Sequence, residues 1–280
     1  MSTAHVLILG AIAGGTIFLG LPIGRMQNLS AATRAGLSAL ATGILIFLLW
    51  DVLSGAVEPV ESALDARHWG RFSWLAILGI AGFALGLMGL VYYAEWMKGR
   101  SRRRATSLVG PGAAAVDEFK ARTWLDGLTP GKQLALLIAI GIGVHNFGEG
   151  LAIGQAAATG AASLAVTLSI GFALHNATEG FGICGPMSGE GTVPSWGFLA
   201  VLGLIGGGPT FLGTLLGNAW SSEAMSVVFF AIAAGSILYV VQELFAVNRK
   251  YGHTVLVTWL VLAGIVLGFA TDFVVSASGL

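Results

Sequence analysis

The sequence predicts an all-α polytopic membrane protein, and three observations lead to this fold class. Of the 280 residues, 55% are hydrophobic and only 10% are charged. The mean hydropathy of +0.83 is far above that of a soluble globular domain. The apolar residues also fall into long runs, and a helix of about 20 such residues crosses the hydrocarbon core of a bilayer. We therefore expect lipid to surround most of the chain.

Eight segments meet this length requirement, with polar or Gly-, Pro- and Ser-containing breaks between them. The predicted spans cover residues 5–24, 35–56, 72–97, 132–157, 162–186, 195–217, 224–247 and 254–275. Their length and lack of alternating polarity argue against the strands of a membrane β-barrel. We expect one transmembrane domain over residues 1–280, with a cytoplasmic linker at about 98–131.

The distribution of positive charge predicts the orientation, because Lys and Arg in short loops stay in the cytoplasm. With both termini outside, twelve of the fourteen basic residues fall on the cytoplasmic side, and only Arg67 and Arg71 fall outside. The twelve are Arg25, Arg34, Lys98, Arg100, Arg102, Arg103, Arg104, Lys120, Arg122, Lys132, Arg249 and Lys250. We expect a cell membrane location, in a prokaryotic inner membrane.

The sequence also contains an internal repeat. Residues 14–24 (GGTIFLGLPIG) and 207–217 (GGPTFLGTLLG) share six identities at an offset of 193. Gly43 and Asp51 in the second span correspond to Gly235 and Glu243 in the seventh, at an offset of 192. Spans 1–3 and 6–8 therefore form two predicted copies around central spans 4 and 5. The copies cross the membrane in opposite senses, as in the inverted repeats of many secondary transporters.

The central spans carry the strongest chemical signal, which is a duplicated H-N-x-x-E-G motif. The motif occurs as His145, Asn146 and Glu149 in span 4, and as His175, Asn176 and Glu179 in span 5. On a helix, residues i and i+4 lie on one face. Two adjacent helices could thus bring imidazole, carboxylate and amide groups together, and these groups suit a divalent transition metal.

A second interpretation is that these polar residues only join the helices by hydrogen bonds, as Asn and His can do in a membrane. Two carboxylates favour the metal site, because each charge near the bilayer centre costs on the order of 3 kcal/mol.

The two motifs and the eight spans resemble the ZIP (Zrt/Irt-like) family of divalent-metal transporters over nearly the whole chain. This resemblance implies outside termini, two inverted three-span repeats, and a metal site formed by the six motif residues. It also implies zinc uptake toward the cytoplasm. The substrate would be Zn²⁺, with Fe²⁺, Mn²⁺ and Cd²⁺ left open because the same ligands suit them. No prosthetic group and no nucleic-acid partner are expected, and the expected partners are divalent metal ions, the lipid bilayer and a homodimeric copy.

The chain also departs from the family motif, which usually reads H-N-x-P-E-G. Gly148 and Thr178 stand where the motif has Pro. In span 6, Thr210 stands at the place of a family carboxylate that helps to form a second metal position. Because two ions would need more carboxylates than Glu149 and Glu179, we expect one principal metal position.

Four other residues are candidates for the ion pathway: Asp51, Gln155, Thr210 and Glu243. Glu243 lies near the cytoplasmic end of span 7, and Asp51 occupies the corresponding place near the outer end of span 2. Gln155 also suits helix packing. Two further functions remain open. One is an intramembrane metalloenzyme, which would need an open coordination position, and the other is a pore, which would need no inverted repeat.

The charge distribution leads to a test of topology. In a Cys184→Ser background, a cysteine placed near Gly112 should resist impermeant thiol reagents that are added outside, whereas a cysteine near Ala66 should react. The degree of labelling in intact cells measures both. The reverse pattern would contradict the predicted orientation.

Overall fold

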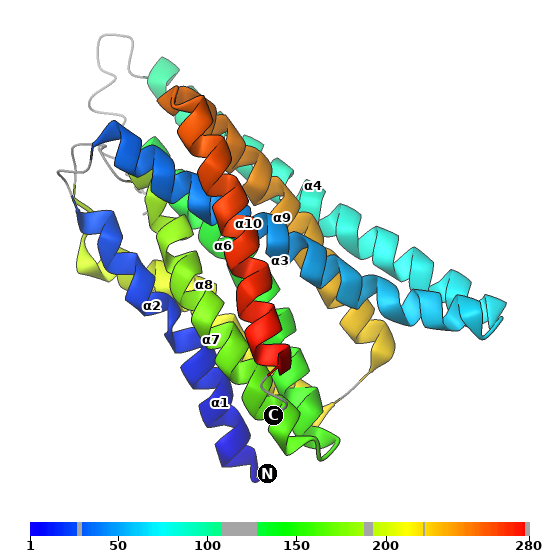
Figure 1. Ribbon diagram of the computed structural model, residues 1–280. Coiled ribbons are helices and arrows are strands. Elements are labelled where there is room, and N and C mark those ends of the chain that lie inside the picture. The colour runs from blue at the N-terminus through cyan, green and yellow to red at the C-terminus, as the bar shows by residue number, and fades with distance from the viewer. Residues whose placement is uncertain (27–29, 108–127, 188–192, 221, 278–280) are drawn as a thin grey trace.

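The computed structural model describes residues 1–26, 30–107, 128–187, 193–220 and 222–277, and within these ranges the chain forms helices without strands (Figure 1). The helices are α1 (Thr3–Gly15), α2 (Ile17–Gly20), η1 (Leu21–Arg25), α3 (Ala31–Asp65), α4 (Trp69–Ser107), α6 (Pro130–Ala158), α7 (Ala162–Cys184), η3 (Gly185–Met187), α8 (Trp196–Ala219), α9 (Glu223–Tyr251) and α10 (Thr254–Ala277). The fold class predicted from the sequence is confirmed.

Several helix ends follow from capping residues in the sequence. Ser30 caps α3 by accepting a hydrogen bond of 3.1 Å from the amide of Thr33, and Ser195 caps α8 through the amide of Phe198 at 3.1 Å. These bonds satisfy amides that have no partner in the first helical turn. At its end, α9 stops at Gly252, which has a left-handed φ of 73° that favours glycine.

Seven helices in the described residues are long and apolar enough to cross a membrane, judged by length and composition. They coincide with predicted spans 1–4 and 6–8, with α1, α2 and η1 together forming the first. The predicted fifth span coincides with α7, which has 23 residues and carries the second motif, but it is not among the seven. Figure 1 shows the two termini at the same end of the molecule.

Two helices are longer than the sequence predicted. α3 continues to Asp65 instead of residue 56, and its 35 residues include Pro59. At about 1.5 Å per residue, α3 is roughly 52 Å long and exceeds the hydrocarbon thickness. α4 continues to Ser107, so the first part of the predicted 98–131 linker is helical. The prediction ended both helices too early because hydropathy marks where the apolar residues end, and a helix can continue beyond that point. Residues 108–127 of the linker lie outside the described residues.

The helices pack as two four-helix groups. The first group, termed the motif bundle, contains α1, α6, α7 and α8, and the second, termed the outer bundle, contains α3, α4, α9 and α10. α6 is the most enclosed span, with 78% of its apolar window buried, whereas the value for α10 is 11%. The first motif therefore lies at the centre of the protein, and α10 faces lipid.

Close glycine contacts pack the helices of the outer bundle against one another in a matched pattern. A Cβ atom added at Gly43 of α3 would overlap the carbonyl of Val261 on α10, and one added at Gly235 of α9 would overlap the carbonyl of Phe83 on α4. Gly264 and Gly86 make the return contacts, to Leu40 and Ile232 respectively. Leu40 and Ile232 are 192 residues apart, as are Gly43 and Gly235. This is the pairing that two copies related by a two-fold rotation would make.

The glycine contacts predict a difference between two glycines of α4. Gly86→Ala should lower the free energy of unfolding by about 1–3 kcal/mol, because the added methyl group meets the backbone of α9 in a closely packed contact. Gly89→Ala is the matched control, since nothing lies within 4 Å of a Cβ atom at Gly89. Thermal unfolding in detergent measures both. Equal stability of the two variants would contradict the close packing of α4 on α9.

Candidate metal centre

The two motifs lie on neighbouring helices of the motif bundle, and their described His, Asn and Glu side chains are buried in the protein interior. His145, Asn146 and Glu149 belong to α6, with exposed fractions of 2%, 0% and 3%. Asn176 and Glu179 belong to α7, with exposed fractions of 0% and 2%. Polar side chains buried this deeply in an apolar helical bundle are costly unless they have polar or ionic partners. They are therefore candidates for function.

The motif side chains contact one another across α6 and α7. His145 Nε2 lies 3.1 Å from Glu149 Oε1 and 3.8 Å from Glu179 Oε1. Zinc bonds of 2.0–2.2 Å in tetrahedral geometry would separate neighbouring ligand atoms by about 3.4 Å. The imidazole and both carboxylates are thus spaced so that small shifts would admit an ion. The i, i+4 spacing in the sequence explains the contact between His145 and Glu149. The contact between His145 and Glu179 results from the packing of α6 against α7.

Asn146 holds this cluster to a third helix. Its Nδ2 donates to Glu179 Oε2 at 3.1 Å and to the backbone carbonyl of Gly206 on α8 at 2.9 Å. One amide group therefore ties α6, α7 and α8 together and fixes the direction of the Glu179 carboxylate. Groups of this kind orient metal ligands and tune their affinity.

Three buried oxygen atoms beside this network have no hydrogen-bond partner: Asn146 Oδ1, Asn176 Oδ1 and Thr210 Oγ1. Asn176 donates through its Nδ2 to the carbonyl of Ala13 on α1 at 3.0 Å, which fixes the orientation of its amide group while its oxygen has no partner. Buried polar atoms normally have a partner, so each exception needs an explanation. Coordination of a cation by these neutral oxygen atoms would be such an explanation.

The glycines that end both motifs allow the surrounding helices to come close. A Cβ atom at Gly150 would overlap the carbonyl of Thr210 on α8, and one at Gly180 would overlap the carbonyl of Ile17 on α2. Ile17 and Thr210 are themselves 193 residues apart, which is the offset of the predicted repeat. Each motif is therefore packed against the corresponding position of a different predicted copy.

His175 lies on α7, but its side chain is outside the described residues. Among the side chains that are described, no group of three or more His, Cys, Asp or Glu residues is arranged to hold a metal ion as it stands. The structure thus brings together His145, Asn146, Glu149 and Glu179, and it places Asn176 against α1 with its oxygen unpartnered.

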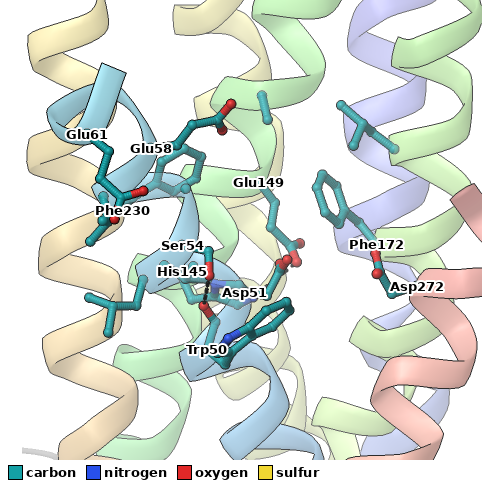
Figure 2. Close-up of a pocket in the computed structure, with 16 residues that line it drawn as sticks. Trp50, Asp51, Ser54, Glu58, Glu61, His145, Glu149, Phe172, Phe230 and Asp272 are labelled. Atoms are coloured by element: carbon teal, nitrogen blue, oxygen red, sulfur yellow. Dashed lines mark hydrogen bonds and ion pairs between the residues drawn. The ribbon is translucent and has the colours of Figure 1, made fainter. Parts of the chain in front are cut away.

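A cavity of about 740 Å³ reaches the buried cluster at His145 and Glu149. Its wall carries four further carboxylates, Asp51, Glu58 and Glu61 from α3 and Asp272 from α10, and we call it the acidic cavity. The described lining residues include no Lys or Arg. Figure 2 shows the Asp51 and Glu149 carboxyl groups directed into the same space. The negative charge of these walls favours cations.

The carboxylates become more buried toward the motif residues. Glu58 and Glu61 are exposed near the end of α3, Asp51 and Asp272 are partly buried, and Glu149 is buried. Sequence reasoning missed Glu58 and Glu61 because it ended the second span at residue 56, and it also missed Asp272, which lies within the predicted eighth span. The signal that could have found two of them is spacing, since positions 51, 58 and 61 lie within one face of a continuous helix.

The four candidate pathway residues have different environments. Asp51 lines the acidic cavity. Gln155 is not among the residues that line it; its Nε2 donates to Ser226 Oγ of α9 at 3.0 Å, which is a helix-packing contact. Thr210 is fully buried in α8. Glu243 is partly buried on α9, one turn from Tyr239, and lies away from the acidic cavity.

The helices and the buried polar cluster define a polytopic membrane protein with ionisable groups in its interior, a feature of proteins that move ions across membranes. The family model described as ZIP Zinc transporter matches residues 126–276, which is more than half of the chain, so the protein belongs to the ZIP family. Membership implies transport of divalent metal ions across a membrane, and it confirms the resemblance carried by the motifs. Comparison with curated proteins gave no match.

The network around Asn146 leads to a prediction about metal affinity. Asn146→Ala removes the donor that orients Glu179, so zinc affinity should fall about 10- to 100-fold. Asn248→Ala is a matched control, because Asn248 is also buried but donates to Thr42 in the outer bundle, at 3.1 Å. Equilibrium titration of the purified protein measures the affinity. An equal loss in both variants would indicate general destabilisation instead of a role at the metal centre.

Proposed function

We propose that the protein carries zinc and similar divalent transition-metal ions across the membrane by alternating access, through a site formed by His145, Asn146, Glu149, His175, Asn176 and Glu179. The observation that supports this most directly is the buried contact among His145, Glu149 and Glu179 at 3.1 and 3.8 Å. Imidazole and carboxylate together suit zinc and neighbouring metals. Asn146 and Asn176 would add neutral oxygen atoms.

The acidic cavity is the proposed route between this site and one side of the membrane. A hydrated cation would first meet the exposed Glu58 and Glu61, then Asp51 and Asp272, and finally Glu149. Charged walls raise the local concentration of cations and speed their capture. By the distribution of Lys and Arg, the side that the cavity faces is the outside, which supports uptake toward the cytoplasm.

The opposite half of the protein offers no comparable route among the cavities that we describe. Large apolar residues of both bundles pack together there, including Leu48 of α3, Ile138 and Ile142 of α6, Leu202 of α8 and Ile237 of α9. An ion at the site can therefore leave toward the cytoplasm only after this cluster separates. Access to one side at a time is the defining feature of alternating access, and it argues for a carrier over a pore.

The inverted repeat provides the means for such a change. The matched glycine contacts of α3 with α10 and of α4 with α9 support two copies of opposite orientation. In transporters of this type, one group of helices rocks against the other around a fixed site. The motif bundle and the outer bundle are the two proposed units.

We infer one tightly bound ion per chain. Glu149 and Glu179 together match the charge of one divalent ion, and Thr210 adds an oxygen without charge. A second ion would leave an uncompensated charge of +2 in a medium of low dielectric constant. The carboxylates of the acidic cavity, most of which are exposed or partly buried, would serve capture instead of tight binding.

The proposed site predicts the effect of removing its ligands. Replacement of His145, Glu149, His175 or Glu179 by Ala should reduce zinc uptake into proteoliposomes at least about tenfold, because each change removes a ligand or its charge. Glu223→Ala is the control, since Glu223 pairs with Arg71 at the protein surface. An intramembrane enzyme would show no flux in the unmodified protein, and normal flux in the His175 and Glu179 variants would contradict a site on two helices.

A further inference from the structure

The two motif asparagines are held by equivalent backbone groups of the two predicted copies. Asn146 Nδ2 donates to the carbonyl of Gly206 on α8 at 2.9 Å. Asn176 Nδ2 donates to the carbonyl of Ala13 on α1 at 3.0 Å. Ala13 and Gly206 are 193 residues apart, which is the offset of the predicted repeat. The same hydrogen bond is therefore made twice, and each motif makes it to a different copy.

The two carbonyls lie where α1 and α8 cross. Gly14 directly follows Ala13 in the chain. Gly207 directly follows Gly206, again at an offset of 193. A Cβ atom at Gly14 would overlap the carbonyl of Gly207, and a Cβ atom at Gly207 would overlap the carbonyl of Gly14. Equivalent residues that contact each other reciprocally lie at a two-fold axis, so this glycine crossing marks the axis that relates the two copies.

The carbonyls determine which way each asparagine amide faces. A backbone carbonyl can only accept a hydrogen bond, so the amide atom beside it is the donor Nδ2 and not the oxygen. The Oδ1 atoms of Asn146 and Asn176 are buried and have no hydrogen-bond partner. Asn146 is held further by its second bond, to Glu179 Oε2 at 3.1 Å. Both amides are thus fixed through their nitrogen atoms, which leaves two neutral oxygen atoms for a cation.

We propose that Gly14 and Gly207 are positioning residues of the metal centre. Their contact fixes the two carbonyls, and the carbonyls orient Asn146 and Asn176 as oxygen ligands of the ion. This inference rests on the proposed transport function and adds two residues that act on the ion only through the asparagines. Because the contact is shared, a side chain at either glycine would separate α1 from α8 and displace both carbonyls. Groups that orient metal ligands in this way contribute to affinity without touching the metal.

The test measures the zinc affinity of the purified protein by equilibrium titration. Gly14→Ala and Gly207→Ala should each lower the affinity about 10- to 100-fold, which is the range for groups that orient metal ligands. Gly15→Ala and Gly208→Ala are matched controls, since these neighbouring glycines have nothing within 4 Å of an added Cβ atom. The controls should change the affinity less than about twofold. Gly86→Ala, which creates a backbone overlap in the outer bundle, controls for lost stability.

A double-mutant cycle separates positioning from general destabilisation. In a background that carries both Asn146→Ala and Asn176→Ala, the residual zinc affinity should no longer respond to Gly14→Ala or Gly207→Ala, whereas the thermal unfolding temperature should still fall. A loss of affinity that persists in this background would overturn the positioning role. An equal loss in Gly86→Ala would overturn it as well.

Infrared difference spectra provide a second measurement that needs no glycine variant. Zinc binding to the unmodified protein should shift the side-chain carbonyl bands of asparagine, and Asn146→Ala and Asn176→Ala should each remove part of this shift. Asn248→Ala should leave it intact, because Asn248 bonds to Thr42 in the outer bundle. Asparagine bands that do not respond to zinc would overturn the proposal, since the two glycines would then orient no ligand. Zinc binding that does not depend on His145 would contradict the proposed function itself, and the positioning role with it.

Discussion

The structure depends on one constraint, which is the cost of keeping two carboxylates and an imidazole in the middle of an apolar bundle. Glu149 and Glu179 are 3% and 2% exposed, in a region where a lone charge is unfavourable by several kcal/mol. The cost is tolerable only if other polar groups or a cation stand close to them. His145 and Asn146 fill part of this need, since His145 contacts both carboxylates and Asn146 donates to Glu179. A divalent ion would compensate the remaining charge, so binding and stability are coupled at this site.

The glycines follow from the same constraint. Short polar side chains such as Asn146 can reach a neighbouring helix only if the two backbones are close, and α6 approaches α8 closely because Gly143 and Gly150 lack side chains. Gly180 has the same effect between α7 and α2. In lipid, where apolar burial gives little net drive for helix association, such contacts and the hydrogen bonds they permit supply much of the specificity. The glycines therefore shape the proposed binding site as well as the helix packing.

Much of this arrangement could be predicted from the sequence, and what could not be predicted has a physical cause. Hydropathy located the helices, and the i, i+4 spacing placed His145 and Glu149 on one face, which the 3.1 Å contact confirms. Hydropathy failed at the ends of α3 and α4, since a helix that leaves the membrane continues without an apolar signal. For that reason Glu58 and Glu61 were missed. The partner of Gln155 on α9 and the pairing of Asn176 with Ala13 could not be predicted either, because each depends on which helices are neighbours in space.

The contacts between α6 and α9 connect the site to any conformational change. Along α6, Gly148 and Gln155 lie seven residues apart on one face, and they meet Phe230 and Ser226, which lie four residues apart on α9. These contacts between α6 and α9 include few hydrogen bonds. Inside each bundle, by contrast, glycines pack against backbone carbonyls, so a shift of one helix would bring backbone atoms into collision. If the bundles shift against each other, α6 carries His145, Asn146 and Glu149 with it. The metal centre would then move as a unit past the wall formed by α3 and α9, and the four carboxylates on that side would remain behind to receive the next ion.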